Sequence, residues 1–323
     1  MYGVVVRGRN LYYEAVASAA RHAGIPVICI GNLTTGGTGK TPLVIDVARR
    51  LSAMGRRPAI ITRGYAARSA ETSDEVLEIR AALPEIPVVV NADRVAAVAG
   101  ARRDHDADCV VLDDGFQHRR LARDLDIVVI DALDPWGGGR LLPAGRLREP
   151  MSSLRRAGLF VISRANQVGD SVVQAIREAT LRIAPHRPIL TAAVRVDRAV
   201  ALGEQQSPAT DLRNANVLAV CGIGNPATFL RLLSDHGCRV CDRRIFPDHH
   251  RYRAPDAERI AAAAERAGVE RVVTTRKDWV KLAPLWRGLN APAELVRVDI
   301  RLDLCDAAGE LDEQLHRVVE QGS

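Results

Sequence analysis

Aromatic residues are scarce in this chain, where Phe, Trp and Tyr together make up 4% of 323 residues. Proteins that hold single-stranded nucleic acid stack successive bases on exposed aromatic rings. A chain with so few rings is poorly equipped for that task, so we expect no nucleic-acid partner.

Long hydrophobic runs are also missing. No apolar stretch of the sequence approaches the ~18 residues that a helix needs to span a bilayer. The N-terminal region has no signal peptide with a long apolar core and a small-residue cleavage site. The sequence therefore predicts a protein that is made and kept in the cytoplasm.

The six cysteines do not suggest a disulfide framework. Three of them lie in apolar, strand-like runs, where a free thiol packs as a small hydrophobe, and a reducing compartment is expected. Cys238 and Cys241 form one CxxC pair near His249 and His250, which could suggest zinc. A single pair is a weak zinc signature, and the residues between the two cysteines fit an alternating strand.

Positive charge slightly exceeds negative charge, with 45 Lys and Arg against 39 Asp and Glu and a net charge of +6. This balance suits an anionic ligand or an anionic membrane surface, although an ordinary arginine-rich composition gives the same balance. The hydrophobic content of 47% is enough for a substantial core.

A glycine-rich loop at residues 31–42 lies between an apolar run, 26–30, and an amphipathic stretch, 43–51. A strand, a glycine-rich loop and a helix in this order direct backbone N–H groups and the positive end of a helix dipole at one point, which binds phosphate. We expect Lys40 to reach the β- and γ-phosphates of a nucleoside triphosphate and the Thr41 hydroxyl to bind Mg²⁺. The predicted nucleotide-binding residues are Thr34, Thr35, Gly36, Gly37, Thr38, Gly39, Lys40 and Thr41, with Thr34 at the first glycine position of the usual motif.

Apolar runs alternate with helical stretches from residue 26 to about 164, as in the βαβ units of a doubly wound fold. Because most runs are continuously apolar, the strands should be parallel and buried on both faces. We predict an α/β protein of the P-loop NTPase type, with a mostly parallel sheet and a second, smaller α/β domain. The predicted domains are residues 1–186, including an N-terminal membrane-facing segment, and residues 187–323, for which the family resemblance given below implies closure over the site.

Asp113 and Asp114 follow the apolar run 109–112. An acid at the end of a buried strand, downstream of a phosphate loop, is the Walker B arrangement that holds Mg²⁺ directly or through water. Adjacent residues point to opposite faces of an extended chain, so one carboxylate can serve the metal while the other orients a neighbour. A simple Asp-Asp-Gly turn is the alternative.

Phosphoryl transfer also needs cations and a group that deprotonates the acceptor. Candidate cations are Arg63, Arg94 and Arg146, each in or next to a predicted loop. At the N-terminus, Tyr2, Leu11 and other apolar residues are interleaved with arginines, as in an interfacial membrane helix. A plain docking helix or strand explains that pattern equally well.

Seven segments together resemble one family over nearly the whole chain. They are Gly31–Thr34 running into Gly36–Pro42, Arg63–Tyr65, Asp113–His118, Leu142–Glu149, Gly222–Pro226, Phe246–His249, and Thr275–Asp278 with Lys281. The segment Asp-Asp-Gly-Phe-Gln-His at 113–118 is the most specific of these. The family is tetraacyldisaccharide 4′-kinase, the lipid A 4′-kinase of Gram-negative bacteria.

The resemblance implies an enzyme that uses ATP and Mg²⁺ to phosphorylate the 4′-hydroxyl of a tetraacyl glucosamine disaccharide 1-phosphate, giving lipid IVA. It implies that Asp74, in the stretch Ser73–Val76, is the base and that His249 assists it. The remaining residues that fall where the family places site residues are Arg63, Tyr65, Arg94, Gln117, His118 and Arg146.

The same resemblance implies a cytoplasmic enzyme that is peripheral on the inner face of the inner membrane, with a lipid substrate and no obligate protein partner. Two other functions remain open from the residues themselves: a regulatory P-loop ATPase switch, and a P-loop kinase of a soluble metabolite. Many switch ATPases carry a lysine just before the paired glycines, where this chain has Thr35. The apolar, arginine-rich N-terminus argues mildly against a soluble substrate.

Overall fold

Two compact units make up the chain in the computed structural model, which describes residues 2–16, 20–64, 73–203, 207–208, 212–248, 250–307 and 309–321. The first unit comprises Met1–Ala193 and Leu304–Ser323, and the second comprises Val194–Asp303. The sequence-based division placed all residues after 186 in the second domain. In the structure the last segment groups with the first unit, where Asp312 of α9 (Glu310–Gln321) forms an ion pair of 2.8 Å with Arg50 of α2 (Lys40–Ala53).

The first unit is built on a parallel sheet with the strand order β7-β6-β5-β1-β4-β2-β3. The strands are β1 (Val27–Gly31), β2 (Pro58–Thr62), β3 (Val88–Val90), β4 (Cys109–Asp113), β5 (Leu125–Asp131), β6 (Leu159–Ser163) and β7 (Ile189–Ala201). Every residue of β1, β2, β4, β5 and β6 is buried, which explains why apolar residues dominate these strands in sequence. The predicted doubly wound α/β fold is confirmed.

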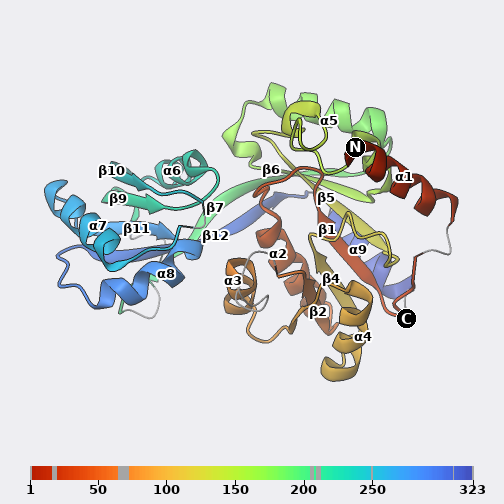
Figure 1. Ribbon diagram of the computed structural model, residues 1–323, viewed down its shortest axis with the longest axis horizontal. Coiled ribbons are helices and arrows are strands. Elements are labelled where there is room, and N and C mark those ends of the chain that lie inside the picture. Colours follow the sequence, from red (N-terminus) through yellow and green to blue (C-terminus); the bar gives the residue numbers. More distant parts are fainter. Residues whose placement is uncertain are drawn as a thin grey trace. The chain divides into compact units, whose positions relative to one another are not determined.

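Helices cover both sides of this sheet (Figure 1). They are α1 (Tyr2–Ala15), α2, α3 (Asp74–Ala82), α4 (Arg94–His105), α5 (Asp170–Ile183) and α9, with short 3₁₀ turns η3 (Gly137–Gly139), η4 (Met151–Arg156) and η5 (Ala165–Gln167). Ala97 of α4 and Ile176 of α5 join one core cluster with Cys29 and Phe160 of the sheet. Within the parts of the chain that the structure describes, no helix has the length and hydrophobicity needed to cross a membrane.

The second unit is a smaller parallel sheet with the order β10-β9-β11-β12. Its strands are β9 (Asn216–Cys221), β10 (Arg239–Ile245), β11 (Arg271–Thr275) and β12 (Glu294–Cys305); β8 (Ser207–Pro208) pairs antiparallel with β7. Its helices are α6 (Pro226–Asp235), α7 (Ala254–Arg266) and α8 (Arg276–Arg287). A second α/β domain was predicted, and the structure confirms it.

The CxxC cysteines have different environments. Cys238 is buried just before β10, whereas Cys241 is exposed on β10, whose residues alternate between exposed and half-buried positions. The remaining cysteines comprise three that are buried in β1, β4 and β9 and one, Cys305, that is exposed at the end of β12.

Gly31, the last residue of β1, lies against Phe116, which is fully buried. A Cβ atom at position 31 would lie 2.5 Å from the Phe116 Cβ and 3.0 Å from its backbone nitrogen. These contacts leave no room for a side chain. The close approach therefore fixes the segment after β4 against the end of β1.

We predict that Gly31→Ala lowers the free energy of unfolding by about 1–3 kcal/mol, because the added methyl group must displace backbone as well as side chain. Gly37→Ala is the control, since an added Cβ there meets nothing within 4 Å. Chemical denaturation of both variants is the measurement. Equal losses in the two variants would contradict the predicted contact.

Candidate active site

The predicted phosphate loop connects the end of β1 to the start of α2. Gly36 and Gly39 have φ angles of 110° and 82°, which favour glycine, and Gly39 is the N-cap of α2. The Thr38 hydroxyl is buried and has no hydrogen-bond partner among the described residues. A phosphate oxygen would supply that partner, so the loop fits the ligand that the sequence predicts.

Lys40, the first residue of α2, lies among polar groups at this end of the sheet. Its ammonium group donates to the Asn32 side-chain oxygen at 3.1 Å and lies 3.5 Å from the Asp114 carboxylate. Asn32 is fully buried and also donates to the Thr34 carbonyl at 2.9 Å. The structure thus shows Asn32 as a site residue that our sequence analysis did not single out.

The two adjacent carboxylates at the end of β4 have different partners, although Asp114 lies beyond the strand and is not extended. The Asp113 carboxylate accepts a hydrogen bond from the Thr62 hydroxyl of β2 at 3.4 Å. Asp114 has a φ angle of 54°. Both of its carboxylate oxygens accept hydrogen bonds from Arg148, each at 2.8 Å, a bidentate arrangement that is strong and geometrically specific.

Their proton affinities are correspondingly far apart. Burial raises the pKa of Asp113 to about 7, and the nearby Glu75 and Asp114 charges add to the increase while Lys40 opposes it. Burial also acts on Asp114, but the Lys40 charge and the Arg148 hydrogen bonds outweigh it and lower its pKa to about 2. One carboxylate is therefore neutralised by protein cations, while the other is buried with too little positive charge around it.

This donor set fits Mg²⁺. The ion is commonly held by one or two carboxylates together with substrate phosphates and water rather than by an all-protein cage. Among the described residues, no group of three or more His, Cys, Asp or Glu side chains could hold a metal. The residues that would hold a phosphate-bound Mg²⁺ are Asp113, Asp114 and Thr41, the last in the first turn of α2.

Four more predicted residues belong to the first unit at or near this edge. Arg94 begins α4 and is buried; burial and the neighbouring Arg63 charge lower its pKa, while Asp113 and Asp114 oppose that change. Burial and the Arg94 charge lower the pKa of His118. The Gln117 amide donates to the Asn32 carbonyl at 2.9 Å.

Arg146 lies in the segment that pairs with the phosphate loop. The Thr35 N–H donates to the Arg146 carbonyl at 2.8 Å. The guanidinium group of Arg146, about half exposed, forms an ion pair with Asp134. The structure therefore places the Arg146 backbone against the loop and its charge on a neighbouring acid.

The structure describes only part of the predicted general base, Asp74, and its assisting residue, His249. Asp74 is the first residue of α3, and the preceding Ser73 hydroxyl accepts a hydrogen bond from the Val76 N–H at 3.4 Å. The Asp74 side chain, Tyr65 and His249 lie outside the described residues.

The ends of β5 and β6 supply contacts to the phosphate loop that our sequence analysis missed. The Ser163 hydroxyl donates to the Thr38 carbonyl at 2.8 Å. Arg164 donates to the Gly37 carbonyl at 2.8 Å and forms an ion pair with Asp131. The available signal was their place after apolar runs, because functional groups gather at the carboxyl ends of parallel strands.

In the second unit, a buried carboxylate organises the segment around the predicted histidine. Asp278 of α8 is fully buried and accepts hydrogen bonds from the Gly222 N–H at 3.0 Å, the Tyr252 hydroxyl at 3.1 Å and the Thr275 hydroxyl at 2.7 Å. The Tyr252 ring packs against Phe246 and His250. Lys277 forms an ion pair of 2.8 Å with Asp248.

Comparison with known proteins gives consistent matches over the chain. A family model described as tetraacyldisaccharide-1-P 4′-kinase matches residues 1–320. A tetraacyldisaccharide 4′-kinase of Anaeromyxobacter sp. (strain Fw109-5) is 42% identical over 310 residues, which cover 91% of this chain and 83% of that protein. One from Halothermothrix orenii is 37% identical over 311 residues, covering 88% and 81%.

A solved structure has a similar fold. It is the crystal structure of an "apo" form of LpxK from Aquifex aeolicus in complex with ATP, with a TM-score of 0.77 and 27% sequence identity. The match covers 98% of this chain and 96% of that chain.

The unequal carboxylates predict opposite effects on stability when each is neutralised. The pKa of Asp113 is raised from 3.8 to about 7, so its ionisation destabilises the fold as the pH rises through that window. Asp113→Asn should therefore raise the free energy of unfolding at pH 8, in metal-free buffer, by about 2–4 kcal/mol, and the gain should shrink toward pH 5.

Asp114→Asn is the matched control. The pKa of Asp114 is lowered from 3.8 to about 2, so its charge stabilises the fold above that window, and the variant should lose ~1–2 kcal/mol at pH 8. Denaturant titrations at both pH values are the measurement. Shifts of the same sign in both variants would contradict the assignment of the two pKa values.

Proposed function

This chain belongs to the tetraacyldisaccharide-1-P 4′-kinase family, and on that basis we propose that it transfers the γ-phosphoryl group of ATP to the 4′-hydroxyl of a tetraacyl glucosamine disaccharide 1-phosphate. The product is lipid IVA, a precursor of lipid A. The observation that carries the proposal is the convergence of the phosphate loop, Lys40 and the paired carboxylates, with Lys40 3.5 Å from Asp114.

ATP is the nucleotide present in the solved relative. In this chain, the buried Thr38 hydroxyl and the Lys40 ammonium group would bind its phosphates. Asp113, Asp114 and Thr41 would hold Mg²⁺, which would supply positive charge against the phosphate oxygens. Arg148 holds Asp114 in a fixed orientation for that role.

The remaining roles are those that membership of the family implies for the matching residues. Lys40 and Arg63 stabilise the negative charge of the transferring phosphoryl group, and Arg146 helps to order the loop through its backbone contact with Thr35. Asp74, assisted by His249, takes the proton from the 4′-hydroxyl. Tyr65, Arg94, Gln117 and His118 bind the substrate.

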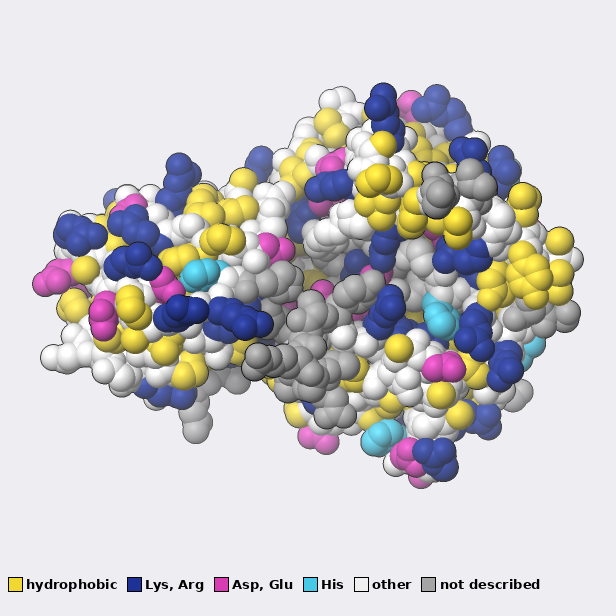
Figure 2. All heavy atoms as spheres, viewed as in Figure 1, with side chains coloured by type: hydrophobic (Ala, Val, Ile, Leu, Met, Phe, Trp, Pro, Cys, Tyr) yellow, Lys and Arg dark blue, Asp and Glu magenta, His cyan; other side chains and the backbone are white. Residues whose placement is uncertain are grey.

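The lipid substrate places the reaction at a membrane surface, which we propose is the inner face of the inner membrane. Helix α1 supports this location, because Val5, Leu11 and Tyr12 are 66%, 65% and 56% exposed. In Figure 2, hydrophobic side chains gather on the surface at the edge of the first unit where α1 lies in Figure 1. Apolar groups on an exposed helix can enter the boundary between lipid headgroups and acyl chains. Neither nucleic acid nor an obligate protein partner is part of the proposal.

The test is transfer of the γ-phosphate from labelled ATP to a detergent-dispersed disaccharide 1-phosphate lipid, with and without Mg²⁺. We expect labelling of the lipid that depends on Mg²⁺. ATP hydrolysis without labelled lipid would favour a switch ATPase or a kinase of a soluble metabolite.

Lys40→Ala should lower kcat/KM in this assay by about 10²–10³-fold, because it removes a cation that stabilises the transferring phosphoryl group. Arg49→Ala, an exposed cation on the same helix, is the control and should remain near wild type. Near-normal turnover in the Lys40 variant would contradict the role of the phosphate loop.

Asp74→Ala should lower kcat far more than it weakens ATP binding, because a general base acts on the acceptor and not on the nucleotide. Steady-state kinetics and direct ATP binding are compared with Glu85→Ala, an exposed acid just beyond α3. Equal losses of kcat and of ATP affinity would contradict the base assignment.

A further inference from the structure

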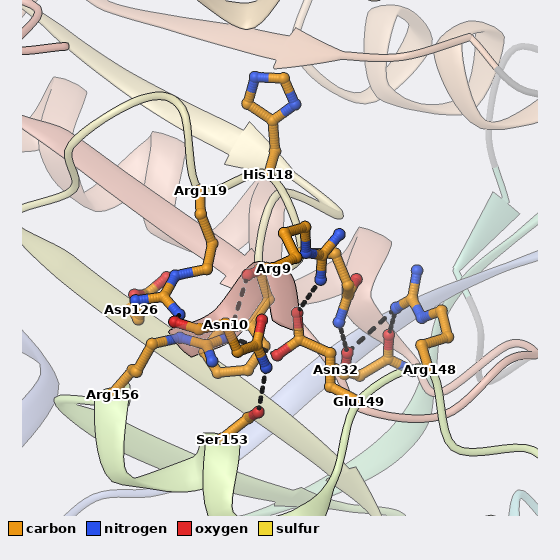
Figure 3. Close-up of polar contacts among 12 residues, drawn as sticks. Arg9, Asn10, Asn32, His118, Arg119, Asp126, Arg148, Glu149, Ser153 and Arg156 are labelled. Carbon is orange, nitrogen blue, oxygen red and sulfur yellow. Dashed lines mark hydrogen bonds and ion pairs between the residues drawn. The ribbon is translucent and has the colours of Figure 1, made fainter. Parts of the chain in front are cut away.

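A buried carboxylate joins helix α1 to the segment that lies against the phosphate loop. Glu149 is fully buried and accepts one hydrogen bond from Arg9 of α1 at 2.6 Å and another from Arg156 of η4 at 2.7 Å (Figure 3). A buried carboxylate is costly unless it is paired, and here each oxygen has its own guanidinium group. Helix α1 and the segment 149–156, which are distant in sequence, are therefore held together at this carboxylate.

Helix α1 makes further contacts with the same region. The Asn10 amide donates to the Ser153 hydroxyl of η4 at 3.3 Å, and the Tyr2 hydroxyl donates to the Arg148 carbonyl at 2.9 Å. Arg119, which follows the Asp113–His118 segment, donates to the Asn10 carbonyl at 3.0 Å. The helix is thus attached along its length to residues 148–153 and to the segment after β4.

The two neighbours of Glu149 in this network reach the phosphate site. Arg148 donates to both Asp114 oxygens and to the Asn32 side chain, and Asn32 accepts from Lys40. Arg156 lies over the Phe116 ring, 4.2 Å from its centroid, and donates to the Phe116 carbonyl at 3.3 Å. Glu149 therefore binds Arg156 directly and is the next residue in the chain after Arg148.

The backbone of this segment also pairs with the phosphate loop itself. The Arg148 N–H donates to the Leu33 carbonyl at 2.7 Å, and the Thr35 N–H donates to the Arg146 carbonyl at 2.8 Å. A shift of residues 146–149 would therefore move the entry of the loop as well as Arg148. The ion pairs of Glu149 hold one end of this segment.

We propose that Glu149 is a positioning residue through which helix α1 controls the nucleotide site. Contact of the exposed apolar residues of α1 with an amphiphile surface orders the helix. The Arg9–Glu149–Arg156 bridge transmits that order to Arg148, Asp114, Asn32 and Lys40, and Mg-ATP then binds more tightly. This inference rests on the proposed function for its membrane surface, but it concerns nucleotide binding and can be tested without the lipid acceptor.

The experiment measures the Kd of a non-hydrolysable ATP analogue with Mg²⁺, in the presence and absence of nonionic detergent micelles that contain no acceptor lipid. For the wild type we expect micelles to tighten binding by about fivefold or more, as coupled sites commonly do. In Glu149→Gln and Arg9→Gln the Kd should become independent of micelles. Arg9→Lys, which keeps the charge, should retain part of the effect.

Arg7→Gln is the matched control, because it removes the same charge from the same helix. Arg7 is exposed, and no ion pair is formed with it among the residues that the structure describes. Its micelle dependence should equal that of the wild type. Because the Arg9 side chain is more exposed than that of Glu149, Arg9→Gln still tests the bridge if the Glu149 variant fails to fold.

Two results would overturn the inference: a wild-type Kd that micelles do not change, or full micelle dependence in Glu149→Gln and Arg9→Gln. A weaker Kd in these variants with the micelle effect intact would also overturn it, since that outcome marks a purely structural bridge. Failure of the lipid-labelling assay with the micelle effect present would contradict the proposed function and leave this coupling standing.

Discussion

Parallel pairing of β1 with β4 brings the two halves of the candidate site to one edge of the sheet. In this register Ile30 lies opposite Asp113, so the phosphate loop that follows β1 starts beside the paired carboxylates that follow β4. The approach of Gly31 to Phe116 holds the segments after the two strands together. This pairing brings Asp114 within reach of Lys40 and Arg148. Both of these cations also contact Asn32.

The two carboxylates at that edge, Asp113 and Asp114, are balanced by very different amounts of positive charge. The Asp114 carboxylate is already matched by Lys40 and Arg148, which fix its orientation. Asp113 is buried with insufficient positive charge, and its raised pKa indicates a position that a divalent cation would stabilise. Active sites commonly keep such unfavourable groups because ligand binding relieves them.

Local patterns allowed much of this arrangement to be predicted. The phosphate loop, the acids after β4 and the alternation of strands and helices each depend on residues close together in sequence. Asn32, Arg148 and Glu149 depend on pairs separated by up to 140 residues, as in the contact of Glu149 with Arg9. No periodicity reveals such pairs. The return of α9 to the first unit escaped prediction for the same reason, since its contact with Arg50 joins opposite ends of the chain.

The positions of the cysteines allow spectroscopic probes to be attached to thiols without mutating any residue. Burial raises the pKa of Cys29, Cys109, Cys221 and Cys238, so these four stay protonated and shielded from alkylating reagents. Of the two exposed cysteines, Cys241 lies in the second unit, and Cys305 lies at the end of β12, in the segment Leu304–Ser323 that groups with the first unit. A pair of maleimide probes on the natural sequence would therefore report the separation of the two units in solution, and its change when nucleotide is added.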